Sequence, residues 1–379
     1  MRYLLCAYIL LALTGCNDPD DAYQFPNATM KWGDGHAWND SIYDEVAEYS
    51  MFQSQFINVF CDPRFSMREL RARNDSIQVG CYIQAHAVAE WQIKHLNDRT
   101  PSFAQDWAIM GLENLCYTTE GDTARCFNRA YRITVQDSST VDWMVAILKK
   151  WADLSPNSSY DGLSFMVDYC SIPAETYVYG QQRRDMHGEL DMDRDGVPHL
   201  NDPVEQEALR DGYCYYVDEL RKAFPNMKII ANGKMAHNDP DFMERLDGVF
   251  VEGAFKYWPS GLSDAVFVDF VNASRFFRPG GFSVLEGGGR YGMAMAMMLD
   301  TPQHRVYGVV QDGATRTLAR DNLKWWNIGT PEQWLVRNDH QLIRAYNSGV
   351  ATLDLTDGEY PAPFRFKAYG SDNSLKVGF

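Results

Sequence analysis

Short apolar runs that alternate with helical patterns constrain the fold of this chain more than any other feature. Two of the runs begin with Asp-Gly and end on a carboxylate: residues 161–168 read DGLSFMVD, and residues 247–252 read DGVFVE. Continuous apolar runs of about four to eight residues behind a turn signal are typical of fully buried strands. Such strands belong to parallel sheets that helices cover on both faces. The chain is therefore predicted to be an α/β protein.

Runs of this kind recur along the chain and favour a (β/α)8 TIM barrel. The expected strands cover residues 49–57, 77–85, 131–135, 162–168, 227–231, 248–252, 282–286 and 306–311. Apolar side chains with a helical period predict helices over 141–154 and 204–224. After residue 330, short alternating runs with glycine turns predict a small C-terminal β appendage. The expected domains are the catalytic barrel, residues 31–330, and the appendage, residues 331–379.

Residues 1–16 are expected to be an export signal rather than part of the fold. Arg2 precedes an apolar stretch over residues 3–12 that is too short to span a bilayer, and the tetrapeptide LTGC follows. This tetrapeptide is similar to a bacterial lipobox, in which Cys16 becomes the lipidated first residue; the alternative is an ordinary signal peptide cleaved nearby. Residues 17–30 would form a polar tether. The expected location is the cell envelope or the outside, with membrane contact only through the lipid.

Charge and motif content weigh against several function classes. The chain has 35 Lys and Arg against 51 Asp and Glu, a net charge of −16 at pH 7. An acidic surface repels phosphate backbones, so nucleic acid is not an expected partner. The sequence also lacks a Gly-x-Ser-x-Gly elbow, a P-loop, a His-Glu-x-x-His motif and a dinucleotide glycine fingerprint after a strand. These absences weigh against esterase, kinase and protease functions.

Cysteine usage leaves two alternatives open. The chain has 8 cysteines, of which Cys6 and Cys16 belong to the expected signal. An exported protein can form disulfides from the others, and Cys116 with Cys126 is the local candidate pair. Because a chain of this size can build a core without covalent staples, buried free thiols are an equal alternative.

Two acids at expected strand ends are the first candidates for catalysis. Asp168 and Glu252 each end an apolar run, and the C-terminal strand ends of a barrel carry its site. One acid can protonate the leaving oxygen while the other attacks or activates water, which is the chemistry of glycoside hydrolysis. The alternative for each is a salt-bridged acid at the barrel rim. Glu286 also ends an expected strand and is the main rival for either role, unless it pairs with Arg290.

Four further residues are candidates for binding a sugar. Asn232 can hydrogen-bond a hydroxyl, although Asn-Gly also favours a turn for conformational reasons alone. His86 and Tyr169 follow expected strands, with a structural hydrogen bond as the default for each. Trp258 can stack on a sugar ring or pack against the rim.

An acidic loop after the fourth expected strand has the spacing of a calcium loop. Asp191, Asp193 and Asp195 occupy positions 1, 3 and 5, and a glycine follows at position 6. Asp202 is at position 12, where an EF-hand has Glu, and Glu205 is nearby as a substitute. The carbonyl of Val197 would be the ligand at position 7. The neighbouring prolines do not suit the exiting helix of an EF-hand, so we expect an inserted loop that binds Ca²⁺ for a structural purpose. The alternative is a solvated acidic loop.

The segment from Tyr160 to Phe255 resembles glycosyl hydrolase families related to the α-galactosidase-like and polygalactosaminidase-like TIM barrels. The likeness lies in the order of its features, which are Tyr160-Asp161-Gly162 with Asp168, the loop from Asp191 to Gly196, Leu220-Arg221, Ile230-Ala231-Asn232-Gly233, Gly248 with Glu252-Gly253-Ala254-Phe255, and later Asn347-Ser348-Gly349-Val350. A Met-rich stretch at residues 293–298 departs from the pattern of the families.

The resemblance implies a TIM barrel with an acid after strand four and another after strand six, which carries over to Asp168 and Glu252. The expected function is a glycoside hydrolase that cleaves a poly- or oligosaccharide. The alternatives are a non-catalytic glycan-binding lipoprotein and a calcium-dependent surface lipoprotein on the same scaffold.

Overall fold

The structure is a computed structural model, and all statements below concern the residues that it describes. These are residues 27–31, 38–126, 130–158, 163–168, 188–232, 239–251, 276–286, 296, 298–301, 303–309, 331–338, 341–346, 349–354, 364–368 and 375–376.

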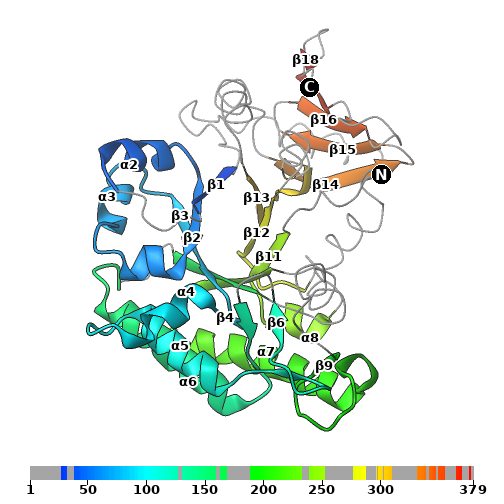
Figure 1. Ribbon diagram of the computed structural model, residues 1–379. Coiled ribbons are helices and arrows are strands. Elements are labelled where there is room, and N and C mark those ends of the chain that lie inside the picture. The colour runs from blue at the N-terminus through cyan, green and yellow to red at the C-terminus, as the bar shows by residue number, and fades with distance from the viewer. Residues whose placement is uncertain are drawn as a thin grey trace.

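Parallel strands form a closed barrel at the centre of the molecule (Figure 1). Around the barrel their order is β1 (Asn27–Lys31), β13 (Arg305–Val309), β12 (Phe282–Leu285), β11 (Gly248–Val251), β10 (Lys228–Asn232), β8 (Leu163–Asp168), β3 (Gln78–Ile83) and β2 (Met51–Gln55). Because all strands are parallel, their carboxyl ends meet at one rim and their amino ends at the other. The predicted (β/α)8 barrel is confirmed.

Two details of the strand prediction were wrong, and they offset each other. The expected strand at residues 131–135 is not in the barrel. Instead β7 (Ala130–Arg132) pairs antiparallel with β4 (Ala87–Ala89) and β6 (Arg125–Cys126) in a separate small sheet. The first barrel strand is β1, which begins inside the segment expected to be a tether. The sequence pattern does not predict β1, because its sequence, NATMK, has no continuous apolar run. The strand that ends at Asp168 is therefore still the fourth in the barrel.

Alternate residues of the strands fill the barrel interior, as the period of two requires. Met166, Ile230, Phe250, Val284 and Tyr307 belong to this inner core. The intervening residues point outward into a larger core between the barrel and its helices. One contact in that outer core joins the ring of Phe165 on β8 to the ring of Phe224, with 4.9 Å between the centroids.

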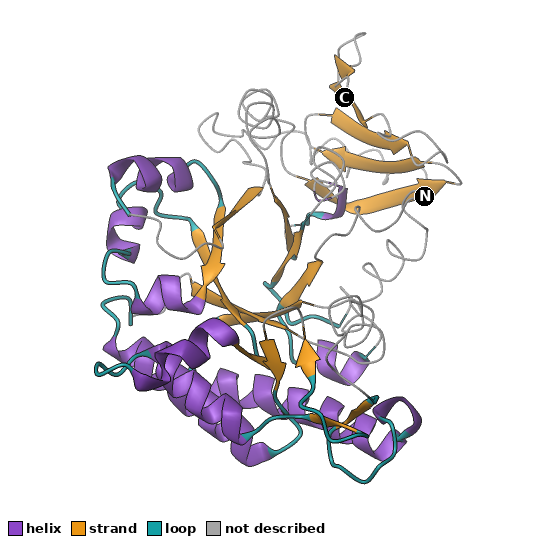
Figure 2. Ribbon diagram, in the orientation of Figure 1, coloured by secondary structure: helices purple, strands orange, loops and turns teal. Residues whose placement is uncertain are grey.

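The described helices lie outside the barrel, mainly at the left and bottom of the view in Figure 2. They are α2 (Asp40–Ala47), α3 (Met67–Arg71), α4 (Glu90–Ile93), α5 (Phe103–Glu113), α6 (Ser138–Leu154), α7 (Pro203–Ala223) and α8 (Pro240–Met243). The helices expected over 141–154 and 204–224 are confirmed as α6 and α7. Among the described residues, no helix has the length and apolar character needed to cross a bilayer.

Shorter elements connect these parts. They are η1 (Ile57–Cys61), η2 (Lys94–Asn97), η4 (His199–Asn201), β5 (Tyr117–Thr118) and β9 (Leu190–Asp191). β5 and β9 pair antiparallel, so the segment after β3 is joined to the segment after β8 outside the barrel.

The C-terminal part forms a separate antiparallel sheet, which confirms the predicted appendage. Its strands are β14 (Pro331–Asn338), β15 (Gln341–Tyr346), β16 (Gly349–Asp354), β17 (Phe364–Ala368) and β18 (Leu375–Lys376), paired in that order. Arg344 of β15 is buried and donates to the carbonyl of Met298 at 3.2 Å. This bond attaches the appendage to the segment between β12 and β13.

Free thiols account for part of the cysteine content. Cys61, Cys81 and Cys214 are free, and burial raises the pKa of the Cys61 thiol to about 12. Cys116 is buried, whereas the side chain of Cys126 lies outside the described residues. The disulfide between these two residues therefore stays a prediction.

Candidate active site

The carboxyl ends of β3, β8, β10 and β11 form one stretch of the barrel rim, because these strands are neighbours in that order. Their register places three polar residues in one row. Ile83 is level with Val167, so Gln84 and Asp168, the residues that follow them, leave adjacent strands at the same level. Asp168 is in turn the partner of Asn232 on β10. We call Gln84, Asp168 and Asn232 the polar row.

Glu286 lies at the same rim, directly after β12. Its backbone N–H donates to the carbonyl of Val251, the last residue of β11, at 3.0 Å, and its side chain is half-buried. Glu286 therefore leaves the barrel beside the end of β11. The side chain of Asp168 and the whole of Glu252, Tyr169 and Trp258 lie outside the described residues, and their roles stay predictions.

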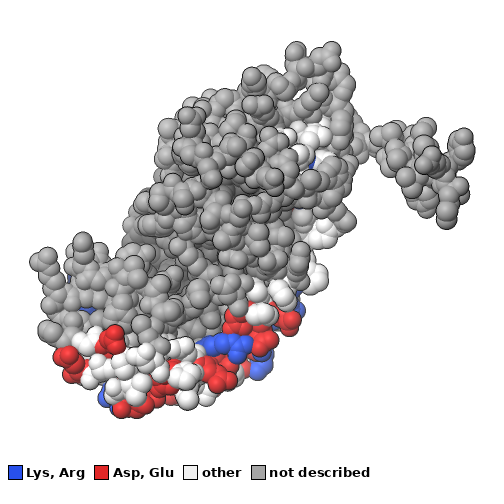
Figure 3. Space-filling view, turned by 90° about the vertical axis from the view of Figure 1, so that its right-hand side faces the viewer, with Lys and Arg blue, Asp and Glu red and all other residues white. Residues whose placement is uncertain are grey.

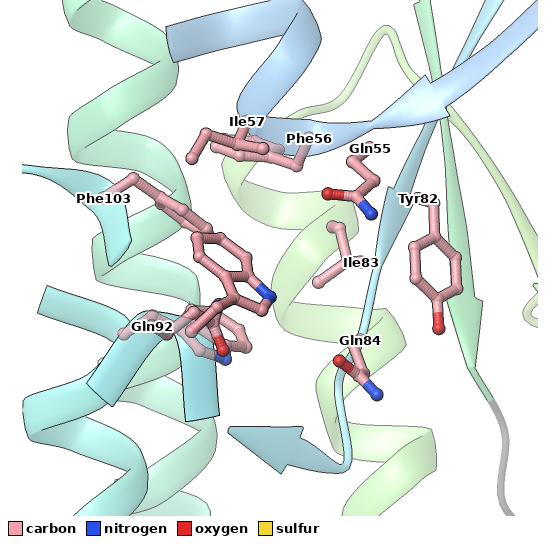
Figure 4. A pocket seen from close by; sticks show the side chains of 10 residues that line it. Gln55, Phe56, Ile57, Tyr82, Ile83, Gln84, Gln92 and Phe103 are labelled. Carbon is pink, nitrogen blue, oxygen red and sulfur yellow. The ribbon is translucent and has the colours of Figure 1, made fainter. Parts of the chain in front are cut away.

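A small pocket of about 60 Å³ opens beside Gln84 of the polar row, at the carboxyl ends of β2 and β3 (Figure 4). It is lined by Gln55, Phe56, Ile57, Tyr82, Ile83, Gln84, Trp91, Gln92, Phe103 and Trp107. Aromatic rings with a few amide groups are the combination that binds a sugar, because the rings cover its C–H face and the amides pair with hydroxyls.

Two polar groups of the pocket are already used by the protein, whereas two others are available. The indole Nε1 of Trp107 donates to the Ala87 carbonyl at 3.1 Å, and the Gln92 Oε1 accepts from the Ala89 N–H at 2.8 Å. Within the described part of the chain, no hydrogen bond engages the amide of Gln55 or Gln84. Figure 4 shows these two glutamines on either side of Ile83, with Phe56 and Phe103 across from them.

His86 does not line this pocket, although it follows β3 as expected. Its side chain is only 1% exposed, and its carbonyl accepts from the Ile133 N–H at 3.0 Å. Burial, with a smaller contribution from the charge of Arg132, lowers the pKa of His86 to about 3. The imidazole is therefore neutral at physiological pH and is held inside the protein.

Sequence reasoning missed Gln55, Gln84 and Trp91. The signal for Gln84 was present, because it follows an apolar strand just as Asp168 ends one, whereas Gln55 ends β2, whose sequence MFQSQ is not an apolar run. A glutamine alone does not indicate a binding site. Only the register of β3 against β8 shows that Gln84 lies at the level of Asp168. Nothing local marks Trp91, whose place in the pocket depends on the packing of α4 and α5.

The acidic loop folds as a compact turn after β9. One carboxylate oxygen from each of Asp191, Asp193 and Asp195 lies within 4.8 Å of the others. Asp191 is buried, whereas Asp193 and Asp195 are exposed. Desolvation, together with the charges of Asp195, Glu205 and Asp191, raises the pKa of Asp193. The face in Figure 3 shows acidic side chains gathered along its lower edge, at the height of α7 and β9 in Figure 1.

Asp202 lies outside this cluster of three acids and instead caps a helix. Its Oδ1 accepts from the N–H groups of Val204 at 2.8 Å and Glu205 at 3.1 Å, so it caps α7. The confirmed helix α7 begins at Pro203, directly after the loop. Proline is tolerated there because the first helical position needs no N–H donor. Val197 donates its N–H to Asp195 Oδ1 at 2.7 Å.

Comparisons with known proteins give matches only at the level of structure. No family model and no curated protein matches the sequence. The structure is similar to the GH36 α-galactosidase AgaA from Geobacillus stearothermophilus, with a TM-score of 0.46, 12% identity, and coverage of 94% of this chain and 51% of that chain. The chain thus spans about half the length of that α-galactosidase.

Two further solved structures are similar to a comparable degree. One is the β-galactosidase from the psychrophilic Marinomonas ef1, with a TM-score of 0.44, 10% identity, and coverage of 76% of this chain and 54% of that chain. The other is a variant of the glycoside hydrolase domain of PelA from Pseudomonas aeruginosa, with a TM-score of 0.41, 9% identity, and coverage of 75% and 94%.

Proposed function

We propose that this protein is a glycoside hydrolase that acts on a poly- or oligosaccharide, with Asp168 and Glu252 as its carboxylate pair. The observation that carries the proposal is the strand order of the barrel. Asp168 is the last residue of β8, the fourth strand, and Glu252 is the next residue in the sequence after β11, the sixth. Only β10 lies between these two strands.

The strand spacing suits this chemistry. Strands two positions apart have Cα atoms about 10 Å apart, since neighbours are separated by about 4.8 Å. Acid side chains that reach inward from such positions can approach to the roughly 5–9.5 Å that glycosidases use. In our proposal Asp168 is the nucleophile or base and Glu252 the general acid. Glu286, which leaves the barrel beside β11, is the alternative acid.

The pocket beside Asp168 supports a carbohydrate substrate. We propose that Gln55 and Gln84 pair with sugar hydroxyls while Trp91 covers one face of the ring, and that Asn232 contacts the sugar unit at the cleaved bond. The site would be presented on the cell envelope or outside the cell, through the lipid anchor proposed at Cys16.

The test is the rate of sugar release from a broad panel of glycans by the wild type and by Asp168→Asn and Glu252→Gln. We expect each variant to lose at least about a thousandfold in rate, because each removes one half of a two-carboxylate mechanism. Glu286→Gln is the matched control and should lose much less. A wild type that binds glycans but releases no sugar would instead identify a glycan-binding protein, and equal loss in all three variants would overturn the assigned pair.

A further inference from the structure

The acidic loop after β9 contains a buried carboxylate that the protein itself does not satisfy. Asp191 is 2% exposed, and its Oδ1 has no hydrogen-bond partner within the described part of the chain. Its Oδ2 accepts from the Gly196 N–H at 3.0 Å, which holds the carboxylate in one orientation. A buried anionic oxygen without a donor is costly, so a positive partner is expected at this position.

No cation of the described chain fills that role. Arg194 lies inside the loop, yet its guanidinium is placed over the ring of Tyr117, 3.5 Å from the centroid. Among the described residues, no Lys or Arg forms an ion pair with Asp191, Asp193 or Asp195. Three carboxylates therefore converge without a protein counter-charge, although like charges this close repel one another.

The surrounding groups are engaged in holding the loop rather than in facing the cluster. Glu205 is buried beneath the loop, where its Oε1 accepts from the N–H groups of Met192 and Asp193 and its Oε2 hydrogen-bonds His199 Nδ1 at 2.6 Å. Asp202 caps α7. The acids at positions 12 and 15 of the loop thus have structural partners of their own.

We propose that this loop binds one Ca²⁺ ion through Asp191, Asp193 and Asp195, with the Val197 carbonyl and water completing the shell, and without Asp202 or Glu205. The three side-chain ligands are all carboxylates, and oxygen donors of this kind favour a hard cation such as Ca²⁺. Since the bidentate acid of an EF-hand is not part of the set, we expect a dissociation constant on the order of 10⁻⁴ M, as in extracellular modules.

The position of the loop defines what the ion would do. Asp191 pairs with Tyr117 in the β5–β9 ladder, and the Thr119 N–H donates to the Glu189 carbonyl at 2.8 Å. The ion would therefore fasten the chain that leaves β3 to the chain that leaves β8. The first of these chains begins at Gln84 and the second follows Asp168, so calcium would join two segments that continue from the polar row.

The test is a titration of the full chain, treated with EDTA and then dialysed, with CaCl₂ by calorimetry and with Tb³⁺ by luminescence excited through Tyr117. We expect one site in the wild type and a rise in melting temperature of roughly 3–5 °C at 5 mM Ca²⁺. Asp193→Asn with Asp195→Asn should abolish both signals, yet should melt in EDTA no lower than the wild type, because the repulsion is relieved.

Two controls separate this ligand set from its alternatives. Asp211→Asn removes an exposed charge on α7 and should leave binding unchanged. Asp202→Ser keeps a capping oxygen and should bind within about threefold of the wild type, whereas an EF-hand-like set would lose at least about tenfold. Absence of a saturable site in the wild type at 5 mM Ca²⁺, or undiminished binding by the double variant, would overturn the proposal.

Discussion

At the scale of single residues, the polar groups of the rim are determined by the residue at which each strand ends. Gln84, Asp168 and Asn232 occupy one level because β3, β8 and β10 are in register, not because they are close in the sequence. The described side chains of β8 are buried up to this level, and the polar residues follow at the carboxyl ends of the strands. A short, rigid strand thereby holds a polar group with little conformational entropy left to lose when a ligand binds.

Substitution of a pocket glutamine should weaken sugar binding more than it slows the chemistry. We expect Gln84→Ala to raise KM about five- to tenfold with little change in kcat, since one neutral hydrogen bond contributes about 1 kcal/mol. Steady-state kinetics and titration of Trp91 fluorescence with sugar would measure this. Gln78→Ala, at the other end of β3, is the control. A fall in kcat alone would contradict a binding role.

At the scale of elements, α7 lies unusually close to the chain ahead of α6, and a glycine permits this. A Cβ placed on Gly212 would lie 2.0 Å from the carbonyl oxygen of Val135, a backbone atom that cannot rotate away. The helical period predicts α7, but nothing in that period indicates the partner of Gly212. The period of the apolar residues indicates which face of a helix is buried. The element that packs against that face depends on the arrangement of the whole barrel.

Gly212→Ala should therefore destabilise the protein even though alanine favours helices. We expect a loss of about 2–3 kcal/mol in the free energy of unfolding, as for other overpacked interiors. Asp211→Ala, one residue earlier on the exposed face, should change stability by no more than about 0.5 kcal/mol. Urea denaturation of both variants measures the difference, and equal stability of the two would show that α7 can shift to make room.

The difference between a local sequence pattern and a contact set by the whole barrel explains what the sequence could and could not predict. Strands such as 163–168 and 282–285 were predictable because continuous apolar runs are typical of burial on both faces. β1 was not, since NATMK alternates and is defined by its pairing with β2 and β13. The acids at the strand ends were visible as local patterns, whereas the pocket was hidden because its walls come from β2, β3, α4 and α5.

At the scale of the whole molecule, buried neutral histidines link stability to pH. His304 Nε2 hydrogen-bonds Ser283 Oγ at 2.8 Å, and Ser283 Oγ also accepts from the Val249 N–H. Ser283 keeps its own hydroxyl hydrogen, which it can donate to the imidazole when His304 is neutral. Burial lowers the pKa of His304 to about 4, with a smaller contribution from Lys228.

Acidification should accordingly weaken the fold. A histidine whose pKa is lower in the folded state contributes stability above about pH 6.5, and this is lost as the pH falls toward 4. We expect His304 to account for about 2 kcal/mol of the loss between pH 7 and 5. His304→Gln, which keeps an acceptor for Ser283, should flatten the profile, while the exposed His95→Gln should not. Identical profiles for wild type and His304→Gln would refute this linkage.

The place where β1 enters the barrel bears on the lipid anchor that we propose at Cys16. Asn27 lies at the amino end of the barrel, opposite the rim that carries Gln84, Asp168 and Asn232. With a lipid on Cys16, at most about 36–40 Å of extended chain would separate the bilayer from Asn27. With such an anchor, the amino end of the barrel would face the membrane and the rim would open away from it, toward the polymer substrate of the proposed hydrolase.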